Sequence, residues 1–95
     1  MTVYELIEEL KKYPPETRTV IPYCEGGYVD IIAVKKEPIV LNCLNMFHYG
    51  NHEIKRNYEA DLKEEVHFVL PPEKNGGVTD AVILTDDLWD FEKGK

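Results

Sequence analysis

The sequence contains no apolar run approaching the ~20 residues that a membrane span needs, and it does not open with the charged and then apolar stretch of a secretory signal. It has two cysteines among 95 residues, too few for a disulfide scaffold. Basic side chains are scarce as well, since 11 lysines and arginines face 18 acidic residues and give a formal net charge of -7. A surface of this charge repels phosphate backbones and anionic lipids. We therefore expect a cytoplasmic protein that binds neither nucleic acid nor a membrane.

Catalytic motifs are lacking too. The chain has no phosphate-binding glycine loop, no dinucleotide-binding fingerprint and no nucleophile elbow. Cys24 is followed by Glu25, whose negative charge disfavours a reactive thiolate. Asp86 and Asp87 are adjacent, an arrangement that in a terminal tail is nearly always solvated charge. We therefore predict that the protein is not an enzyme.

The chain does contain enough apolar residues, 43% of the total, to form one small core. A length of 95 residues is that of a single domain. We expect residues 1–95 to fold as one unit that carries an acidic, aromatic tail at residues 86–95.

The first residues predict a capped helix. Thr2 and Glu5 have the spacing of a capping box, in which each side chain bonds the backbone N–H of the other residue. Apolar residues then recur at helical spacing, until Tyr13 precedes Pro14, which disfavours helical geometry at the residue before it. The sequence therefore predicts a helix over residues 3–12, with an apolar face made of Val3, Leu6, Ile7 and Leu10.

Five later segments are rich in β-branched or alternating apolar residues and predict strands. The pair Gly26 and Gly27 supplies the positive φ angles of a hairpin turn, and Pro38 suggests a further turn at residues 36–38. The predicted strands are residues 18–23, 28–35, 39–44, 65–70 and 78–85. We therefore predict an α+β fold in which the N-terminal helix packs on an antiparallel sheet of four to five strands.

Residues 45–64 show little periodicity, and they hold two histidines and three aromatic residues. A loop of this length inside a small domain is usually functional or mobile. The alternative is a short amphipathic helix that uses Tyr58 and Leu62. Both interpretations stay open at the level of the sequence.

Metal binding is one hypothesis for this segment. Cys43, His48 and His52 follow a Cys-x4-His-x3-His pattern, and Cys24 comes from a neighbouring predicted strand. Two sulfur and two nitrogen ligands are a set that zinc accepts. The paired-cysteine knuckle of many zinc sites is missing, so buried cysteines and exposed loop histidines are the other interpretation. Apart from zinc, we expect no cofactor.

Aromatic residues in acidic surroundings are the candidates for binding a protein partner. Tyr28 and Asp30 follow the hairpin glycines, Tyr49 lies in the long loop, and Trp89 and Phe91 alternate with acidic residues of the tail. Large aromatic side chains contribute strongly to cores and to interfaces alike. Either role is therefore open to Trp89.

The opening segment, TVYELIEELKKYPPETRTVIP followed by EGGYVDI, resembles small uncharacterised proteins encoded by bacteriophages and prophages. These begin with a capped helix, a proline stop, a valine-rich strand and a Glu-Gly-Gly-Tyr hairpin. The resemblance covers residues 2–42 and, more loosely, residues 81–84. It implies an origin and a fold, and it implies no site residues.

For function, we expect a phage-related accessory protein that binds another protein through its acidic surface, for example an inhibitor that occupies a basic site. The alternative is a small metal- or ligand-binding domain centred on residues 45–64. Apolar residues occur on both faces of the strand predicted at residues 28–35. The loop, the tail or a second copy of the chain must then cover the far side of the sheet, and a homodimer is one form of this prediction.

Overall fold

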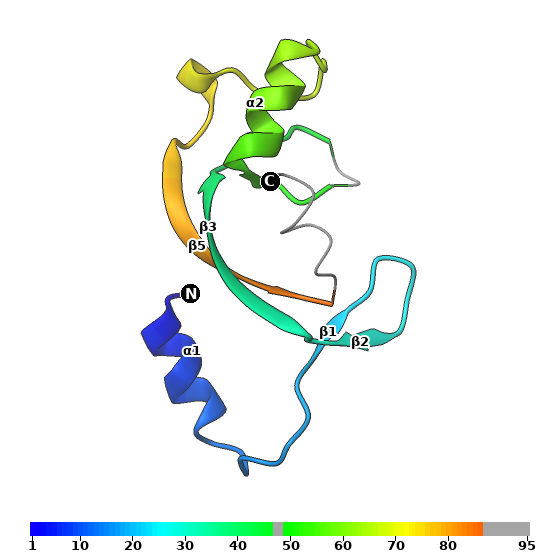
Figure 1. The fold of residues 1–95 in the computed structure, drawn as a ribbon, viewed down its shortest axis with the longest axis vertical. Helices are drawn as coiled ribbons and strands as arrows, with labels where there is room; N and C mark the ends of the chain where they lie inside the picture. The colour runs from blue at the N-terminus through cyan, green and yellow to red at the C-terminus, as the bar shows by residue number, and fades with distance from the viewer. Residues whose placement is uncertain (47–48, 87–95) are drawn as a thin grey trace.

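A computed structural model gives the structure of the protein, and residues 1–46 and 49–86 are described. The chain forms α1 (Val3–Leu10), β1 (Val20–Pro22), β2 (Tyr28–Asp30), β3 (Ala33–Val40), β4 (Glu53–Ile54), α2 (Lys55–Lys63), a short 3-10 helix at Pro72–Lys74 and β5 (Val78–Thr85) (Figure 1). β1 and β2 pair in one antiparallel sheet, and a second antiparallel sheet has the order β4-β3-β5. The α+β class is confirmed, whereas the single sheet of four to five strands is wrong.

The strand predicted at residues 28–35 is divided between the two sheets. β2 ends at Asp30, which pairs with Val20 of β1, and the hairpin glycines Gly26 and Gly27 have the expected positive φ angles of 114° and 71°. Two residues later, the Ile32 N–H donates to the Thr85 carbonyl of β5 at 2.8 Å. The chain therefore changes its pairing partner in the middle of an apolar run, which strand propensity alone does not reveal.

Pro38 lies inside β3, so the turn predicted at residues 36–38 is wrong. β3 and β5 pair over eight residues each, from Ala33 opposite Thr85 to Val40 opposite Val78. Beyond this register, the Leu41 N–H donates to the Gly77 carbonyl at 2.8 Å, so the odd-numbered residues of β3 direct their N–H groups toward β5. The nitrogen of Pro38 therefore faces the other edge, where β4 pairs only with Ile39 and Val40, and no ladder bond is lost.

The strands predicted at residues 39–44 and 65–70 are also wrong. β3 ends at Val40, and Asn42 turns the chain with a φ of 52°. At residues 65–70 one isolated bridge, between Leu44 and Val69, is the pairing that forms among the described residues. The alternation in this segment instead supplies side chains to the core from a series of turns.

The core lies between β3 and α2. It consists of Val40, Cys43, Tyr58 and Val69, each at most 7% exposed. α2 confirms the helical alternative for residues 45–64, with Tyr58 buried and Leu62 packed against the core. Arg56 of α2 also forms a partly buried ion pair with Glu37 of β3 at 3.0 Å, which ties the helix to the strand.

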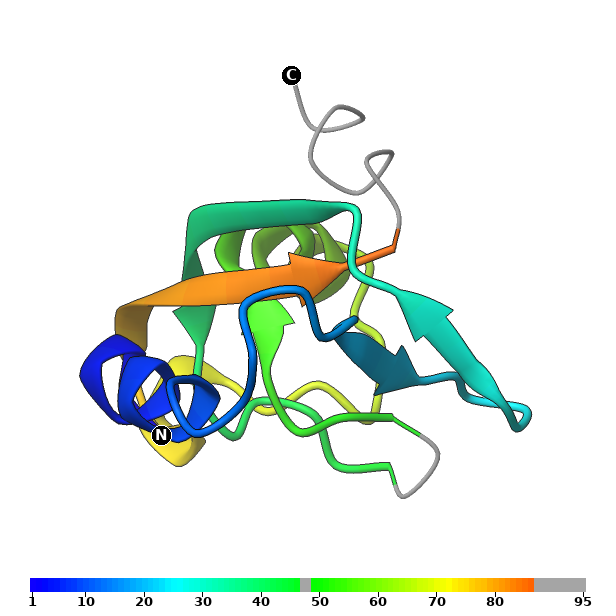
Figure 2. The same cartoon turned by 90° about the horizontal axis from the view of Figure 1, so that it is seen from below.

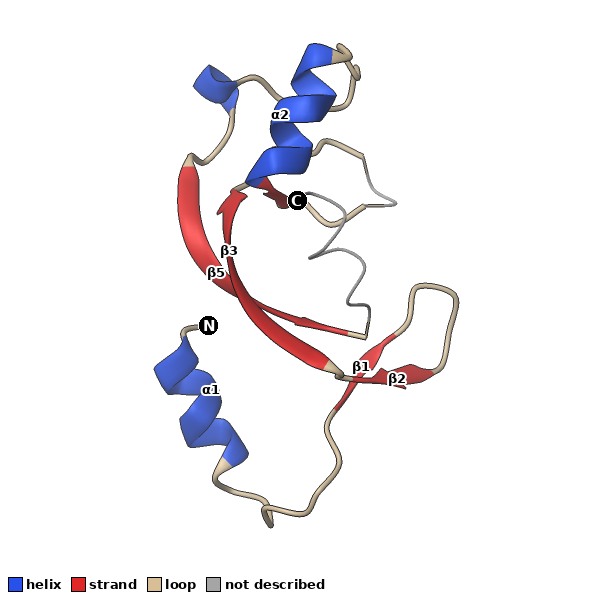
Figure 3. Cartoon of the chain, viewed as in Figure 1, coloured by secondary structure: helices blue, strands red, loops and turns tan. Residues whose placement is uncertain are grey.

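α1 is capped as predicted, but its apolar face is not buried. The Thr2 N–H donates to the Glu5 carboxylate at 2.8 Å, and the Glu5 N–H donates to the Thr2 hydroxyl at 3.1 Å. No residue of α1 is buried, although its apolar face was expected to pack on the sheet. Figure 3 shows α1 and α2 toward opposite ends of the molecule, and Figure 2 shows the same strands from below.

Candidate functional site

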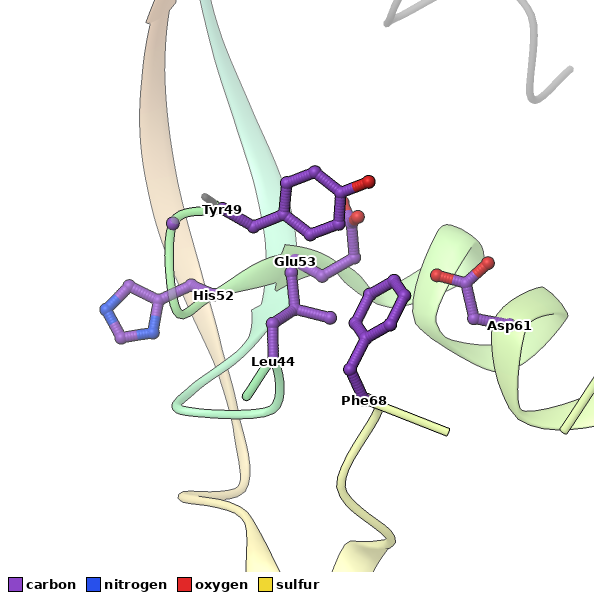
Figure 4. Close-up of a pocket in the computed structure, with 7 residues that line it drawn as sticks. Leu44, Tyr49, His52, Glu53, Asp61 and Phe68 are labelled. Atoms are coloured by element: carbon purple, nitrogen blue, oxygen red, sulfur yellow. The ribbon is translucent and has the colours of Figure 1, made fainter. Parts of the chain in front are cut away.

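A pocket of about 520 Å³ opens beside the core, in the region where the sequence predicted a functional loop. Its wall combines the segment after β3, the segment before β4, β4 itself, α2 and the turn after α2 (Figure 4). The lining residues are Leu44, Tyr49, Gly50, His52, Glu53, Asp61 and Phe68. We call this the acidic aromatic pocket.

Backbone hydrogen bonds fix the floor of the pocket. The N–H groups of Cys43 and Leu44 both donate to the Asn51 carbonyl, at 2.8 and 3.3 Å. From the other side, the Asn45 N–H donates to the Phe68 carbonyl at 2.8 Å, and the Leu70 N–H donates to the Cys43 carbonyl at 2.7 Å. Residues 43–45 therefore join the segment before β4 to the turn after α2.

Polar side chains close the segment before β4 onto the end of β3. The Asn42 N–H donates to Nδ1 of His52 at 2.9 Å, and the Asn51 side-chain amide donates to Oδ1 of Asn42 at 2.8 Å. Because Nδ1 of His52 accepts this bond, the remaining proton of a neutral ring resides on Nε2. Figure 4 shows the imidazole directed away from the aromatic rings, so His52 shapes the rim of the pocket rather than its centre.

Two aromatic rings form one wall. The ring centroids of Tyr49 and Phe68 lie 5.2 Å apart with an interplanar angle of 57°. On Phe68, His67 makes a second, edge-on contact at 5.6 Å and 87°. Phe68 is half-buried, whereas Tyr49 is 54% exposed, so the Tyr49 ring offers a face that a ligand can cover.

Two carboxylates complete the pocket. Glu53 comes from β4 and Asp61 from α2, and Figure 4 shows both carboxyl groups on the side toward which the Tyr49 hydroxyl points. Oε1 of Glu53 accepts a hydrogen bond from the Ile54 N–H at 2.8 Å, which fixes the side chain. Among the described lining residues there is no lysine or arginine. The described lining therefore combines aromatic faces with two carboxylates, the combination that attracts organic cations.

The negative charge of the pocket also affects the buried thiol of Cys43. Burial raises the pKa of Cys43, and the carboxylates of Glu53 and Asp61 raise the pKa further. Cys43 is 0% exposed, and its Sγ donates a 3.4 Å hydrogen bond to the Val40 carbonyl. The thiol is therefore a neutral core group and not a nucleophile.

The residues of the zinc hypothesis lie in different surroundings. Cys24 is exposed in the β1-β2 hairpin, Cys43 is buried in the core, and both are free thiols. The Nδ1 atom of His52 is occupied by the Asn42 N–H. His48 lies outside the described residues. Within the described ranges, no group of three or more histidine, cysteine or acidic side chains is arranged to hold a metal ion.

Of the residues expected to bind a partner, the structure places Tyr49 in the pocket. Tyr28 and Asp30 lie on the exposed hairpin, where Asp30 pairs with Arg18 at 3.5 Å. Trp89 and Phe91 lie outside the described residues.

Sequence reasoning missed Glu53, Asp61 and Phe68. Each looked ordinary in the sequence, because 18 acidic residues are spread along the chain and Phe68 fitted a strand pattern. The one available signal was the helical alternative for residues 45–64, which puts Asp61 on the same helix as Tyr58 of the core.

Comparison of the chain with models of known protein families, with curated proteins and with solved structures found no match. The resemblance to phage proteins therefore stays a prediction. Neither helix in the described part of the chain has the length and apolar composition that crossing a bilayer requires.

Proposed function

We propose that the protein is a non-enzymatic binding module, which takes a basic side chain of a partner protein into the acidic aromatic pocket. The observation that carries this proposal is the pairing of Tyr49 and Phe68 with two carboxylates, in a lining whose described residues include no lysine or arginine. Aromatic faces attract lysine ammonium and arginine guanidinium groups, and nearby carboxylates add charge-assisted hydrogen bonds.

The charge of the whole chain supports the same choice of partner. A net charge of -7 accelerates encounters with a basic surface and disfavours acidic competitors. An accessory protein of phage origin that occupies a basic site on another protein would use such a surface. The pocket would then fix the register of the complex through a single inserted side chain.

The test is a calorimetric titration with hexalysine and hexaarginine peptides, with hexaglutamate as the negative probe. We expect the basic peptides to bind and the affinity to fall as salt rises. Glu53→Gln and Asp61→Asn should each weaken binding about threefold or more, and the double variant about tenfold. Glutamine at position 53 retains an oxygen that can accept the hydrogen bond from the Ile54 N–H.

Glu16→Gln is the matched control, because it removes the same charge from an exposed position between α1 and β1. It should leave binding nearly unchanged. Equal weakening by Glu16→Gln would show that net charge alone drives the interaction, and failure of both basic peptides to bind would contradict the proposal.

The size of the pocket favours a second candidate, a small organic cation. A volume of about 520 Å³ lies within the range of small-molecule sites. In this case tetramethylammonium should shift the amide resonances of Tyr49 and Gly50 in an NMR titration at concentrations where sodium does not. Binding of tetramethylammonium without binding of basic peptides would favour this candidate over a protein partner.

A further inference from the structure

Two apolar surfaces of this chain are left uncovered within the described residues. The first is the apolar face of α1, on which Val3, Ile7 and Leu10 are 54%, 46% and 46% exposed. An amphipathic helix normally buries such a face against another element. In this structure the helix is capped and complete, yet none of its residues is buried.

The second surface lies on the face of β3 and β5 that carries their even-numbered residues, at the end away from Val40. Val34 and Val82 are 61% and 44% exposed there. Lys36 and Asp80 lie on the same face and approach each other to 3.8 Å. We call this exposed stretch, from Val34 to Pro38 with its partners on β5, the outer sheet face. At the other end of the same face, Val40 is 2% exposed and belongs to the core with Tyr58 of α2.

The chain exposes more surface than an average compact monomer of its mass. The chain exposes 7582 Å², whereas a folded monomer of 11.0 kDa is expected to expose roughly 5600 Å². If residues 87–95 are set aside with the roughly 1600 Å² that nine unfolded residues can expose, the other 86 residues still exceed the roughly 5200 Å² expected for their own mass by roughly 800 Å². About 800 Å² per partner is what a standard protein interface buries.

We propose that a second copy of this chain covers both surfaces, with α1 of each copy lying on the outer sheet face of the other. A two-fold pair is self-complementary, so each helix-on-sheet contact is made twice. The eight residues of α1 span about 12 Å and the five residues from Val34 to Pro38 about 16 Å, so the helix fits on the exposed stretch of the strand pair.

The connection between α1 and β1 favours this exchange over closure within one chain. Pro14 and Pro15 restrict the backbone just after the helix, and the Thr17 N–H donates to the Pro14 carbonyl at 3.0 Å to form a turn. With this connection formed, both surfaces stay about half exposed in the single chain. A partner of different sequence would need only one of the two surfaces, whereas a second copy uses both.

Sedimentation equilibrium of the full chain tests the proposal. We expect a reversible dimer, whose dissociation constant rises at least tenfold in Ile7→Lys and in Val34→Lys. Two matched controls carry a similar change elsewhere, namely Tyr4→Lys, off the apolar face of α1, and Val20→Lys on β1. Both control side chains are exposed, at 73% and 44%, and both variants should dimerise like the unmodified chain.

Cross-linking then separates contact between copies from contact within one chain. In a Cys24→Ser background, Ile7→Cys protein is mixed with Val82→Cys protein and oxidised. We expect a disulfide-linked heterodimer, together with little linkage when Tyr4→Cys replaces Ile7→Cys.

Three results would overturn the proposal. One is a monomer at every concentration. Another is a dimer that Ile7→Lys and Val34→Lys leave unchanged, since a different surface would then form it. The third is a single-chain disulfide in the Ile7→Cys, Val82→Cys double variant without cross-linking in the mixture, which would place α1 on its own sheet.

Discussion

Replacing Tyr58 with phenylalanine removes one oxygen atom from the centre of the fold and leaves the packing of the ring intact. The Tyr58 hydroxyl donates to the Leu70 carbonyl at 2.7 Å and accepts from the Asn75 side-chain amide at 2.9 Å. It therefore ties α2 to both ends of the segment that leads into β5. Asn75 continues the network, because its Oδ1 accepts from the Gly77 N–H at 2.8 Å.

The expected cost follows from these two bonds. A hydrogen bond contributes about 1 kcal/mol net to the free energy of unfolding, and a buried polar group left without a partner lowers it by about 1–3 kcal/mol. Leu70 and Asn75 are only half-buried, so water can replace part of the loss. We expect Tyr58→Phe to lower the free energy of unfolding by about 1–2 kcal/mol, which for a domain of this size lowers the melting temperature by roughly 5–15 °C.

Urea unfolding followed by far-UV circular dichroism measures this quantity directly. Tyr23→Phe is the matched control, because Tyr23 is 51% exposed and the same atom is removed there from the surface. A loss below about 0.5 kcal/mol in Tyr58→Phe, or an equal loss in Tyr23→Phe, would refute the reasoning, because surface substitutions already reach that size.

Three further predictions concern the pocket and the thiols. Tyr49→Ala should weaken binding of the basic peptides severalfold while lowering the free energy of unfolding by less than about 1 kcal/mol, because the ring is 54% exposed; a loss of about 3 kcal/mol in urea melts would make Tyr49 a core residue. Cys24 should react with Ellman's reagent in the native protein and Cys43 only after unfolding, and rapid reaction of two thiols would contradict the burial of Cys43. Burial raises the pKa values of Cys43 and Tyr58 above their ordinary 9.0 and 10.0, so as the pH rises the unfolded chain loses these protons before the folded chain does. The free energy of unfolding should therefore keep its full value below pH 9 and fall as the pH rises through the higher folded pKa values. Urea melts in this range should show a shallower decline for Cys43→Ala, and an unchanged slope would count against the raised pKa of Cys43.

The elements that the sequence predicted well depend on local signals. The capping box of Thr2 and Glu5 specifies where α1 begins, and β5 spans the predicted residues 78–85. The Gly26-Gly27 turn likewise needs only positive φ angles. Each of these features involves neighbours in the sequence, so no knowledge of distant contacts is required.

The wrong predictions depend on contacts between distant residues. Proline is a turn signal in most sequences, and Pro38 is tolerated here because the short β4 pairs with Ile39 and Val40 and does not reach the nitrogen of Pro38. Whether α1 packs on the sheet is equally a matter of tertiary contacts, since the same apolar face suits an intramolecular or an intermolecular neighbour.

The site was hidden by the same kind of distant contact. Residues 65–70 alternate as a strand would, and a full strand would set Phe68 beside Val66 and Leu70 on one face. Among the described residues this segment instead forms one isolated bridge, between Leu44 and Val69, and Val69 is buried. The Asn45 N–H donates to the Phe68 carbonyl and holds the segment in place. This geometry lets the Phe68 ring meet Tyr49 from the loop before β4. The aromatic wall of the pocket therefore depends on a departure from the strand pattern, because Phe68 lies in the segment where the predicted strand does not form.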